Sequence, residues 1–399
     1  MRKFRPSPDG APDGLRAADT GLATGDAGGF AAAQAGPPKY RFLHMLRGFA
    51  ALWVVLFHIH AFGVTSGYAA NWPGLAYNLA FTWGRGGVAV FFVLSGFVIA
   101  HALENKSIDG RGFAEFFARR SLRLDPPYFV SIAFTLAVAG LIASANGNSA
   151  WTVSGTTIAA HLFYLQELLR TPSISVIYWT LTYEIQFYLV YAFTVGLAQY
   201  LAARGHRMLA RAVDWAMLAL ALAGAALGTE WSLYGLFTNY WFAFYMGVLA
   251  KRACRDRSAV VFLLALVALT LWRAESEPEV FNTPAAVTAV LLVTLNLRDL
   301  LHAGWAPRAL MGLGTISYSL YLTHYPVLRL SLAPAGRLGD IAGTLTVVVA
   351  QLAVTLVVAA LFWRIVEHPS QMLAKKFTLR RRRVAEDSHS VGRHGIEGG

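Results

Sequence analysis

The chain has 399 residues, of which 56% are hydrophobic and only 14% are charged. With a mean hydropathy of +0.47, it cannot keep all its apolar segments inside a water-soluble globule, so we predict a polytopic membrane protein. The net charge of +12 raises the question of nucleic-acid binding. However, the basic residues lie in short loops and at the C-terminal end, a distribution typical of the positive-inside rule, and no nucleic-acid partner is expected.

The two ends of the chain differ in composition from the rest. Residues 1–40 are rich in Gly, Ala, Pro and Asp and contain no apolar run long enough for a signal peptide, so we expect a disordered cytoplasmic tail. Residues 374–399 are polar and basic, and we expect a second cytoplasmic tail that touches anionic membrane lipid. The transmembrane domain is predicted to occupy residues 41–373.

Apolar stretches within this domain predict an all-α transmembrane helical bundle of about ten spans. A shorter stretch, 156–169, carries several polar side chains and predicts one re-entrant or interfacial helix. Basic residues fall in alternate loops, which fits ten spans with both termini in the cytoplasm. The ten stretches lie near 44–64, 85–103, 127–146, 178–200, 211–230, 232–250, 258–273, 282–298, 309–331 and 342–365.

The first apolar stretch contains two polar groups that are candidates for function, Arg47 and His58. A charge this deep in lipid has to face protein or a cavity. Eleven residues at about 100° each return to within about 20° of the starting direction, so both side chains share one helix face, roughly 16 Å apart along the axis. They can line one passage. In the alternative interpretation, Arg47 extends to the lipid headgroups and His58 is a satisfied interior histidine.

Two later stretches place polar groups at a similar depth in the membrane. Glu184 and His324 reach about the level of His58 when depth is counted at about 1.5 Å per residue. The helix that carries His324 has a polar face, because Ser317, Tyr321 and His324 follow i, i+4 and i+7 spacing. A buried carboxylate needs a partner, so Glu184 favours a functional site, whereas the nearby aromatic residues can also form an interfacial belt.

Three arginines on the predicted cytoplasmic side directly precede a proline-marked helix start at Pro126. Arg119, Arg120 and Arg123 together suit a phosphate clamp, because guanidinium groups bind phosphate through paired hydrogen bonds. The same arginines can also be an ordinary positive-inside anchor. The buried His58 favours the clamp.

These residues fall in six sequence blocks through which the chain resembles the acyltransferase-3 family of integral membrane acyltransferases. Members of this family O-acylate bacterial surface polysaccharides, lipopolysaccharide and other glycans. The resemblance covers essentially residues 40–373, and although each block alone is weak, six in the right order are specific. The blocks are Arg47 with His58, Phe91 to Phe97, Arg123 to Tyr128, Trp179 to Glu184, Ser317 to Pro326, and Glu367 to Pro369.

The chain departs from the family pattern in two places. Members often carry an acid three residues before the signature arginine, and here that position is His44. Some members also append a soluble hydrolase-like domain after the last helix, where this chain has a short basic tail. We therefore expect it to work alone or with a separate partner.

The resemblance implies an enzyme of the bacterial inner membrane that moves an acyl group, expected to be acetyl, from cytoplasmic acyl-CoA to a hydroxyl of a cell-surface or exported glycan. Arg119, Arg120 and Arg123 are expected to hold the CoA phosphates and Arg47 to guide the pantetheine arm or the thioester. His58 is the expected general base, because the pKa of histidine lies near working pH. Acyl-CoA enters as a donor substrate, and we expect neither a permanently bound cofactor nor a metal.

On the acceptor side, Glu184 is expected to join the catalytic group by orienting the base or by binding sugar hydroxyls. In an alternative chemistry a serine, Ser95 or Ser317, is acylated before transfer. Aromatic residues are suited to stacking on a sugar ring, as we expect of Trp179. The residues expected to bind substrate are Trp179, Tyr321, His324, Ser317 and Tyr128.

Two rival functions use the same features. A transporter for a small molecule or glycan would use the buried charges as a substrate or proton path, but should tolerate neutralisation of the cytoplasmic arginines. A glycosyltransferase that uses a lipid-linked sugar commonly needs an acidic or metal-binding loop, and the sequence has no Asp-rich or His/Glu metal spacing. The expected partners are acyl-CoA, a hydroxylated acceptor and membrane lipid.

Overall fold

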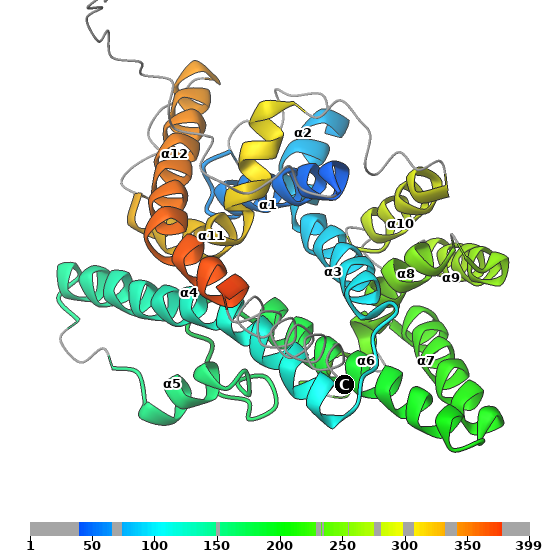
Figure 1. Ribbon diagram of the computed structural model, residues 1–399. Coiled ribbons are helices and arrows are strands. Elements are labelled where there is room, and N and C mark those ends of the chain that lie inside the picture. Colours follow the sequence, from blue (N-terminus) through cyan, green and yellow to red (C-terminus); the bar gives the residue numbers. More distant parts are fainter. Residues whose placement is uncertain are drawn as a thin grey trace, which may run out of the picture. The chain divides into compact units, whose positions relative to one another are not determined.

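Helices make up all the regular secondary structure in the described part of the chain, as the computed structural model in Figure 1 shows. The structure describes residues 40–65, 74–148, 152–228, 233, 235–253, 255–274, 281–297, 307–331 and 341–376. All of them belong to one unit, Lys39–Gly399. The predicted tails at 1–40 and 374–399 lie outside the described residues, apart from residue 40 and residues 374–376.

The predicted all-helical class is confirmed, and a helix lies in each of the ten predicted apolar stretches. The shorter elements are α2 (Gly74–Ala80), α5 (Gly155–Leu162), the 3₁₀ turns η2 (Thr82–Gly86) and η4 (Phe237–Tyr240), and the π-helical turn η6 (Trp363–Glu367). Helix α5 is the short helix predicted within 156–169. The ten longer helices are α1 (Arg41–Ala61), α3 (Gly87–Leu103), α4 (Gly110–Ala145), α6 (Trp179–Ala203), α7 (Arg207–Leu227), α8 (Trp241–Arg252), α9 (Arg257–Ala274), α10 (Asn282–Leu297), α11 (Arg308–Ser331) and α12 (Ile341–Phe362).

By length and composition alone, six segments of the described chain qualify as membrane spans, fewer than the predicted ten or so. Part of the difference lies in short helices: α8 has 12 residues and α10 has 16. At 1.5 Å per residue they rise only about 18 and 24 Å, less than a hydrocarbon core of about 30 Å. The six segments are Arg41–Ala61, Gly74–Leu103, Gly110–Ala145, Trp179–Ala203, Arg207–Leu227 and Gly343–Lys376.

Helix α4 corrects one prediction. The sequence indicated a helix start at Pro126, but α4 begins at Gly110 and continues through Pro126 and Pro127. Its N-terminus is capped by Asp109, whose carboxylate accepts a hydrogen bond from the backbone N–H of Gly112 at 2.6 Å. The three arginines of the predicted clamp therefore lie within the helix and are fixed to its surface.

A serine far away in the sequence allows α4 to pass through the two prolines. Pro126 and Pro127 have no N–H, so the carbonyl oxygens of Leu122 and Arg123, four residues earlier, lose their helical donors. The hydroxyl of Ser370 lies 2.6 Å from the Leu122 oxygen and 3.2 Å from the Arg123 oxygen. This tertiary contact replaces the missing donors, which explains why a proline signal that usually ends or starts a helix is overridden here.

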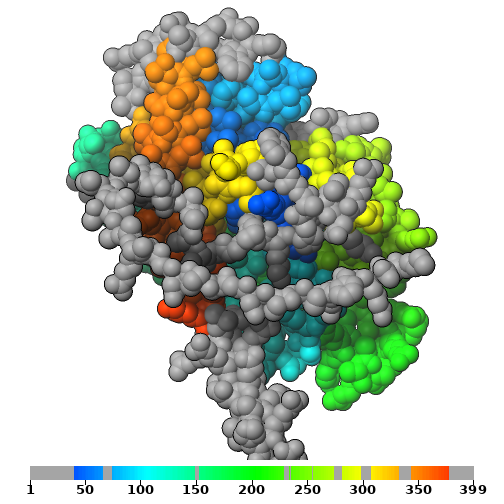
Figure 2. Space-filling model, turned by 45° about the horizontal axis from the view of Figure 1, so that its top comes forward, coloured from blue at the N-terminus to red at the C-terminus, as the bar shows by residue number. Residues whose placement is uncertain are grey.

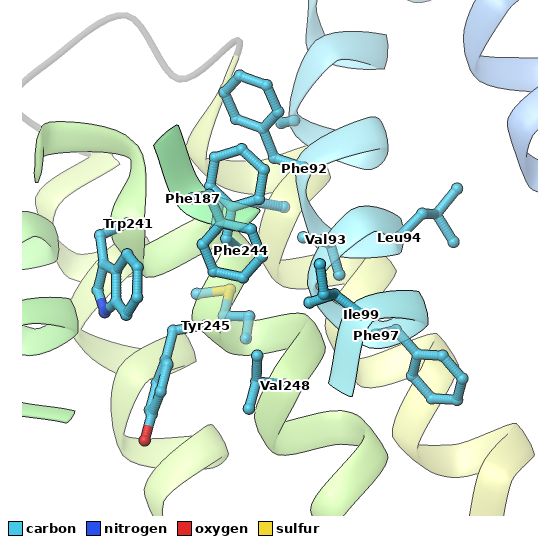
Figure 3. Packing of buried hydrophobic residues seen from close by; sticks show 14 of the residues in the cluster. Phe92, Val93, Leu94, Phe97, Ile99, Phe187, Trp241, Phe244, Tyr245 and Val248 are labelled. Atoms are coloured by element: carbon cyan, nitrogen blue, oxygen red, sulfur yellow. The ribbon is translucent and has the colours of Figure 1, made fainter. Parts of the chain in front are cut away.

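Helices α3 and α8 pack with their backbones in close approach. Gly96 faces the backbone of Phe244 and Gly247 faces the backbone of α3, and neither position has room for a side chain. Beside them the ring of Phe92 stacks on Phe244 with centroids 4.2 Å apart. Figure 3 shows that Phe187 of α6 continues this stack, 4.4 Å from Phe244. The aromatic stack therefore holds α3, α6 and α8 in a fixed relation.

Five helices surround one interior space. Helix α1 packs against α3, α3 against α6, α6 against α4, α4 against α11, and α11 against α1, which closes a ring. Helix α12 covers α11 from outside, and in Figure 2 its orange surface borders the blue surface of the first helices. The polar residues predicted from the sequence come from all five helices of the ring. They are brought together because these helices pack in a closed ring.

The contact between Ser370 and α4 can be tested by mutation. Ser370→Ala removes the donor from two carbonyl oxygens, and we expect it to lower the free energy of unfolding by about 1–3 kcal/mol. The measurement is thermal unfolding of the detergent-purified protein. Ser331→Ala is the matched control, because its hydroxyl bonds locally to the carbonyl of Leu328 in the same helix. Equal shifts for both variants would contradict the proposed role of Ser370.

Candidate active site

A small cavity of about 90 Å³ lies inside the ring formed by α1, α3, α4, α6 and α11. It brings together six of the predicted site residues from four helices. Its lining contains side chains of both charge signs, three arginines and Glu184. Its polar lining consists of Arg47, Ser95, Arg120, Arg123, Thr180, Glu184, Ser317, Tyr318 and Tyr321.

Glu184 is held in this cavity by two hydroxyl groups. The Ser95 hydroxyl and the Tyr188 phenol both donate hydrogen bonds to its carboxylate. Arg120 donates to the same phenol oxygen, and its guanidinium lies 4.0 Å from the centroid of the Tyr188 ring. Tyr188 thus bridges an arginine and a carboxylate, and it fixes both side chains through one buried group. The sequence analysis missed Tyr188, although its i, i+4 spacing from Glu184 could have revealed it.

A second carboxylate, Glu367, lies near two of the arginines, although it comes from the C-terminal part of the chain. It is 3% exposed, and its Oε2 accepts hydrogen bonds from the backbone N–H and the hydroxyl of Ser319 at 3.1 and 2.5 Å. It lies close enough to Arg47 and Arg123 for their charges to act on it. The family block that contains Glu367 was visible in the sequence, but its role as the acid near Arg47 was not.

The position where family members often carry that acid is occupied differently here. His44 pairs through Nε2 with the hydroxyl of Thr315 at 3.1 Å, which links α1 to α11. A carboxylate near Arg47 is therefore still provided, but by η6 instead of by α1.

A larger cavity of about 710 Å³ borders the small one and is strongly basic. Arg120 and Arg123 line both cavities. Arg119 lines only the larger one and forms an ion pair with Glu115. The basic residues that line it are Lys106, Arg119, Arg120, Arg123 and Lys375. This lining suits a ligand that carries several negative charges.

His58 and His324 form a pair at the edge of this region. His324 Nδ1 lies 2.7 Å from the carbonyl oxygen of Tyr321, and His58 Nδ1 lies 3.0 Å from that of Val54. Carbonyl oxygens only accept hydrogen bonds, so in the neutral rings both Nδ1 atoms carry the proton. His58 Nδ1 also lies 3.2 Å from His324 Nε2, which accepts from it. This arrangement leaves His58 Nε2 with a free lone pair, as a general base requires.

The histidine pair is not part of the lining of either cavity. Tyr321 connects the two regions, because it lines the small cavity and its ring centroid lies 5.8 Å from that of His324. His324 is fully buried and His58 is half-buried. Of the two residues predicted to share a helix face and line one passage, Arg47 therefore lines the small cavity and His58 does not.

Two other predicted residues lie elsewhere. Trp179 packs against Phe92, Tyr183 and Tyr240, with ring centroids 5.4 to 6.2 Å away, and lines a separate cavity. Tyr128 is fully buried and stacks on Tyr164 with centroids 4.7 Å apart, away from both cavities described above.

Comparison with known proteins gives the family of the chain. Residues 40–364 match the family model of the acyltransferase domain, and the chain belongs to this acyltransferase-3 family. It is a multi-pass membrane protein and an acyltransferase. No solved structure matches the chain significantly.

Several curated proteins are similar to the chain. Nodulation protein 10 of Rhizobium leguminosarum is 28% identical, over 86% of this chain and 96% of that protein. A putative peptidoglycan O-acetyltransferase of Bacillus subtilis is 26% identical, over 74% of this chain and 52% of its own length. The peptidoglycan O-acetyltransferase of Listeria monocytogenes is 25% identical, over 74% and 53%. The chain thus spans nearly all of the first relative and about half of the other two.

The bridging role of Tyr188 yields a direct prediction. Tyr188→Phe keeps the ring but removes the hydroxyl between Arg120 and Glu184. Hydrogen bonds to charged groups contribute about 1.5–3 kcal/mol, so we expect acyl transfer to fall roughly 10- to 100-fold. The rate is measured with membranes that contain equal amounts of each protein. Tyr245→Phe, a similarly buried tyrosine of α8, is the control, and a Tyr188→Phe rate equal to that of the control would refute the bridge.

Proposed function

We propose that the protein is a membrane-embedded O-acyltransferase that moves an acyl group, acetyl in the first instance, from cytoplasmic acyl-CoA to a hydroxyl of a cell-surface or exported glycan. The observation that carries this proposal is the sharing of Arg120 and Arg123 between a large basic cavity and a small interior cavity. The nucleotide of CoA carries several phosphate charges, whereas its pantetheine arm is long and thin. The large basic cavity suits the charged nucleotide, and the small cavity that shares its arginines suits the narrower arm.

The donor would bind with its phosphates in the basic cavity, held by Arg119, Arg120 and Arg123. Arginine suits this role because its planar fork binds phosphate oxygens in pairs. The pantetheine arm would then enter the small cavity past Arg120 and Arg123 and reach Arg47. The roughly 16 Å from Arg47 to His58 corresponds to about five residues of extended chain, which is the order of length of that arm.

In the proposed reaction His58 Nε2 accepts the proton of the acceptor hydroxyl. The hydroxyl oxygen bonds to the thioester carbonyl carbon, the carbon–sulfur bond breaks, and the sulfur of CoA takes the proton from His58. His324 orients the His58 ring through the contact between their nitrogen atoms. Arg47 guides the pantetheine arm through the small cavity toward His58.

The distribution of basic residues supports one orientation of the protein in the membrane. Lys106 and Lys375 line the large cavity, and Lys251 and Arg252 end the neighbouring helix α8. Basic residues concentrate on the cytoplasmic side of membrane proteins. We therefore propose that the large cavity opens to the cytoplasm, that both termini lie there, and that the membrane is the bacterial inner membrane.

The class of acceptor is suggested by the relatives. Two of them are named peptidoglycan O-acetyltransferases, and another, from Rhizobium meliloti, is named for exopolysaccharide production. These names support a glycan hydroxyl as the acceptor of this protein.

Neutralising the shared arginines tests the donor site and separates the enzyme from a transporter. We expect Arg120→Gln and Arg123→Gln to raise the KM for acetyl-CoA at least about tenfold each, because each removes a charged hydrogen-bond donor to phosphate. Arg204→Gln, at the C-cap of α6, is the control and should leave KM unchanged. If both variants retain the wild-type KM, the donor site is wrong and the transport interpretation gains support.

The general base has its own test. His58→Ala should lower kcat at least about 10²-fold, the usual contribution of general base catalysis, while acetyl-CoA still binds. The measurement is acyl content of surface glycans, by mass spectrometry, in a deletion strain that carries either form at equal protein level. Near-normal acylation by His58→Ala would exclude His58 as the base.

A further inference from the structure

A third cavity, of about 330 Å³, lies at the other end of α3 from the basic cavity. Arg85, Trp179 and Asn282 line it, each at or next to the N-terminal end of a helix. Asn239 and Tyr240 line it from η4, directly before α8. At the opposite end of α3, the chain continues to Lys106. The opposite end of α8 carries Lys251 and Arg252. These basic residues indicate the cytoplasmic side. This third cavity therefore faces the non-cytoplasmic side.

The three cavities follow one another along α3. Val88 lines both the third cavity and the small one, Ser95 lines the small one, and Ala102 lines the basic one. At 1.5 Å per residue, Val88 and Ala102 are about 21 Å apart along the helix axis. The third cavity and the small cavity are thus neighbours that share Val88 in their linings.

The lining of the third cavity has the chemistry of a carbohydrate site. The rings of Trp179 and Tyr240 lie 5.4 Å apart at an angle of 36°, and Phe281 lies 5.2 Å from Tyr240. Together they form an aromatic wall, and Trp179 and Tyr240 are only half-buried, so their surfaces are available. Aromatic rings pack well on the apolar face of a sugar. Arg85, Arg273 and Asn282 add polar groups to the lining of the same cavity.

Asn239, another residue of the cavity lining, has a side-chain oxygen without a partner among the described residues. Asn239 is 8% exposed, and its side-chain oxygen accepts no hydrogen bond from the described part of the chain. A buried amide oxygen without a donor is destabilising, so natural proteins usually satisfy it. Because Asn239 also lines the cavity, a hydroxyl group of a bound ligand is a suitable donor.

We propose that this third cavity is the acceptor subsite, and that it holds one sugar unit of a glycan that enters from the non-cytoplasmic side. The inference rests on the proposed transferase function and adds the location of its acceptor. Trp179 and Tyr240 cover the face of the sugar ring, and Asn239 accepts a hydrogen bond from one of its hydroxyls. The thioester, which approaches through the small cavity, then reaches this sugar from the other side of Val88.

The test uses the full-length protein in cells that contain the native acceptor. Asn239→Ala removes the acceptor oxygen and Trp179→Leu removes the stacking surface. One control is Asn296→Ala. Asn296 lies at the end of α10 away from the third cavity, and its side-chain amide donates a hydrogen bond to the carbonyl of Ala250 in α8. The other control is Trp272→Leu, which changes an exposed tryptophan of α9. Acyl content of surface glycans is measured in a deletion strain at equal protein level, and acetyl-CoA binding is measured on each purified protein.

We expect Asn239→Ala and Trp179→Leu to lower acyl content at least about tenfold, the effect of one lost hydrogen bond or stacking contact. Both should bind acetyl-CoA as the wild type does, and both controls should acylate normally. If the variants acylate at the wild-type level, or if they also lose acetyl-CoA binding, the acceptor subsite is wrong. If deletion of the gene itself leaves acyl content unchanged, the transferase function fails instead, so the two failures are distinguishable.

Discussion

The gathering of three guanidinium groups around one small cavity is the constraint on which the rest of the structure depends. Arg47, Arg120 and Arg123 line it, and among the described lining residues the carboxylate that accompanies them is Glu184. Glu367 adds a second negative group nearby. Charges between membrane helices need partners because the surrounding dielectric is low. Arg120 and Arg123 also line the basic cavity, where their positive charge is available to the phosphates of the proposed donor.

The last helical segment of the described chain organises this charge in two ways. Glu367 lies near Arg47 and Arg123, and Ser370, one turn later, binds the two carbonyl oxygens that the prolines of α4 leave free. Gln371 donates to Glu367 at 2.8 Å and also lines the basic cavity. The same few residues thus hold the arginine-bearing helix in place and provide its counter-charge.

Properties that depend on local sequence could be predicted. A long apolar run forms a helix in a membrane whatever its neighbours are, so the ten helices lie where hydropathy indicated. Intramembrane charges have to face the interior, so Arg47 and Glu184 were identifiable as residues of a shared site before any fold was known.

Properties that depend on distant contacts could not be predicted. The start of α4 was misplaced because Ser370 compensates for the prolines, and nothing near Pro126 in the sequence reveals that contact. For Arg47 and His58, the helical period gives the direction of a side chain but not which neighbour stands beside it. Arg47 lines the small cavity, whereas His58 contacts His324 of α11 and is not part of the cavity lining.

The measurement that tests the central claim most directly is calorimetric binding of acetyl-CoA to the purified protein at increasing salt, with adenosine 3′,5′-bisphosphate as competitor. If the arginines that line both cavities hold the phosphates, the competitor displaces acetyl-CoA, and the affinity for acetyl-CoA falls as salt screens the charges. If the competitor does not displace acetyl-CoA, or if the affinity is independent of salt, the positive charge of this site has another purpose and the account is contradicted.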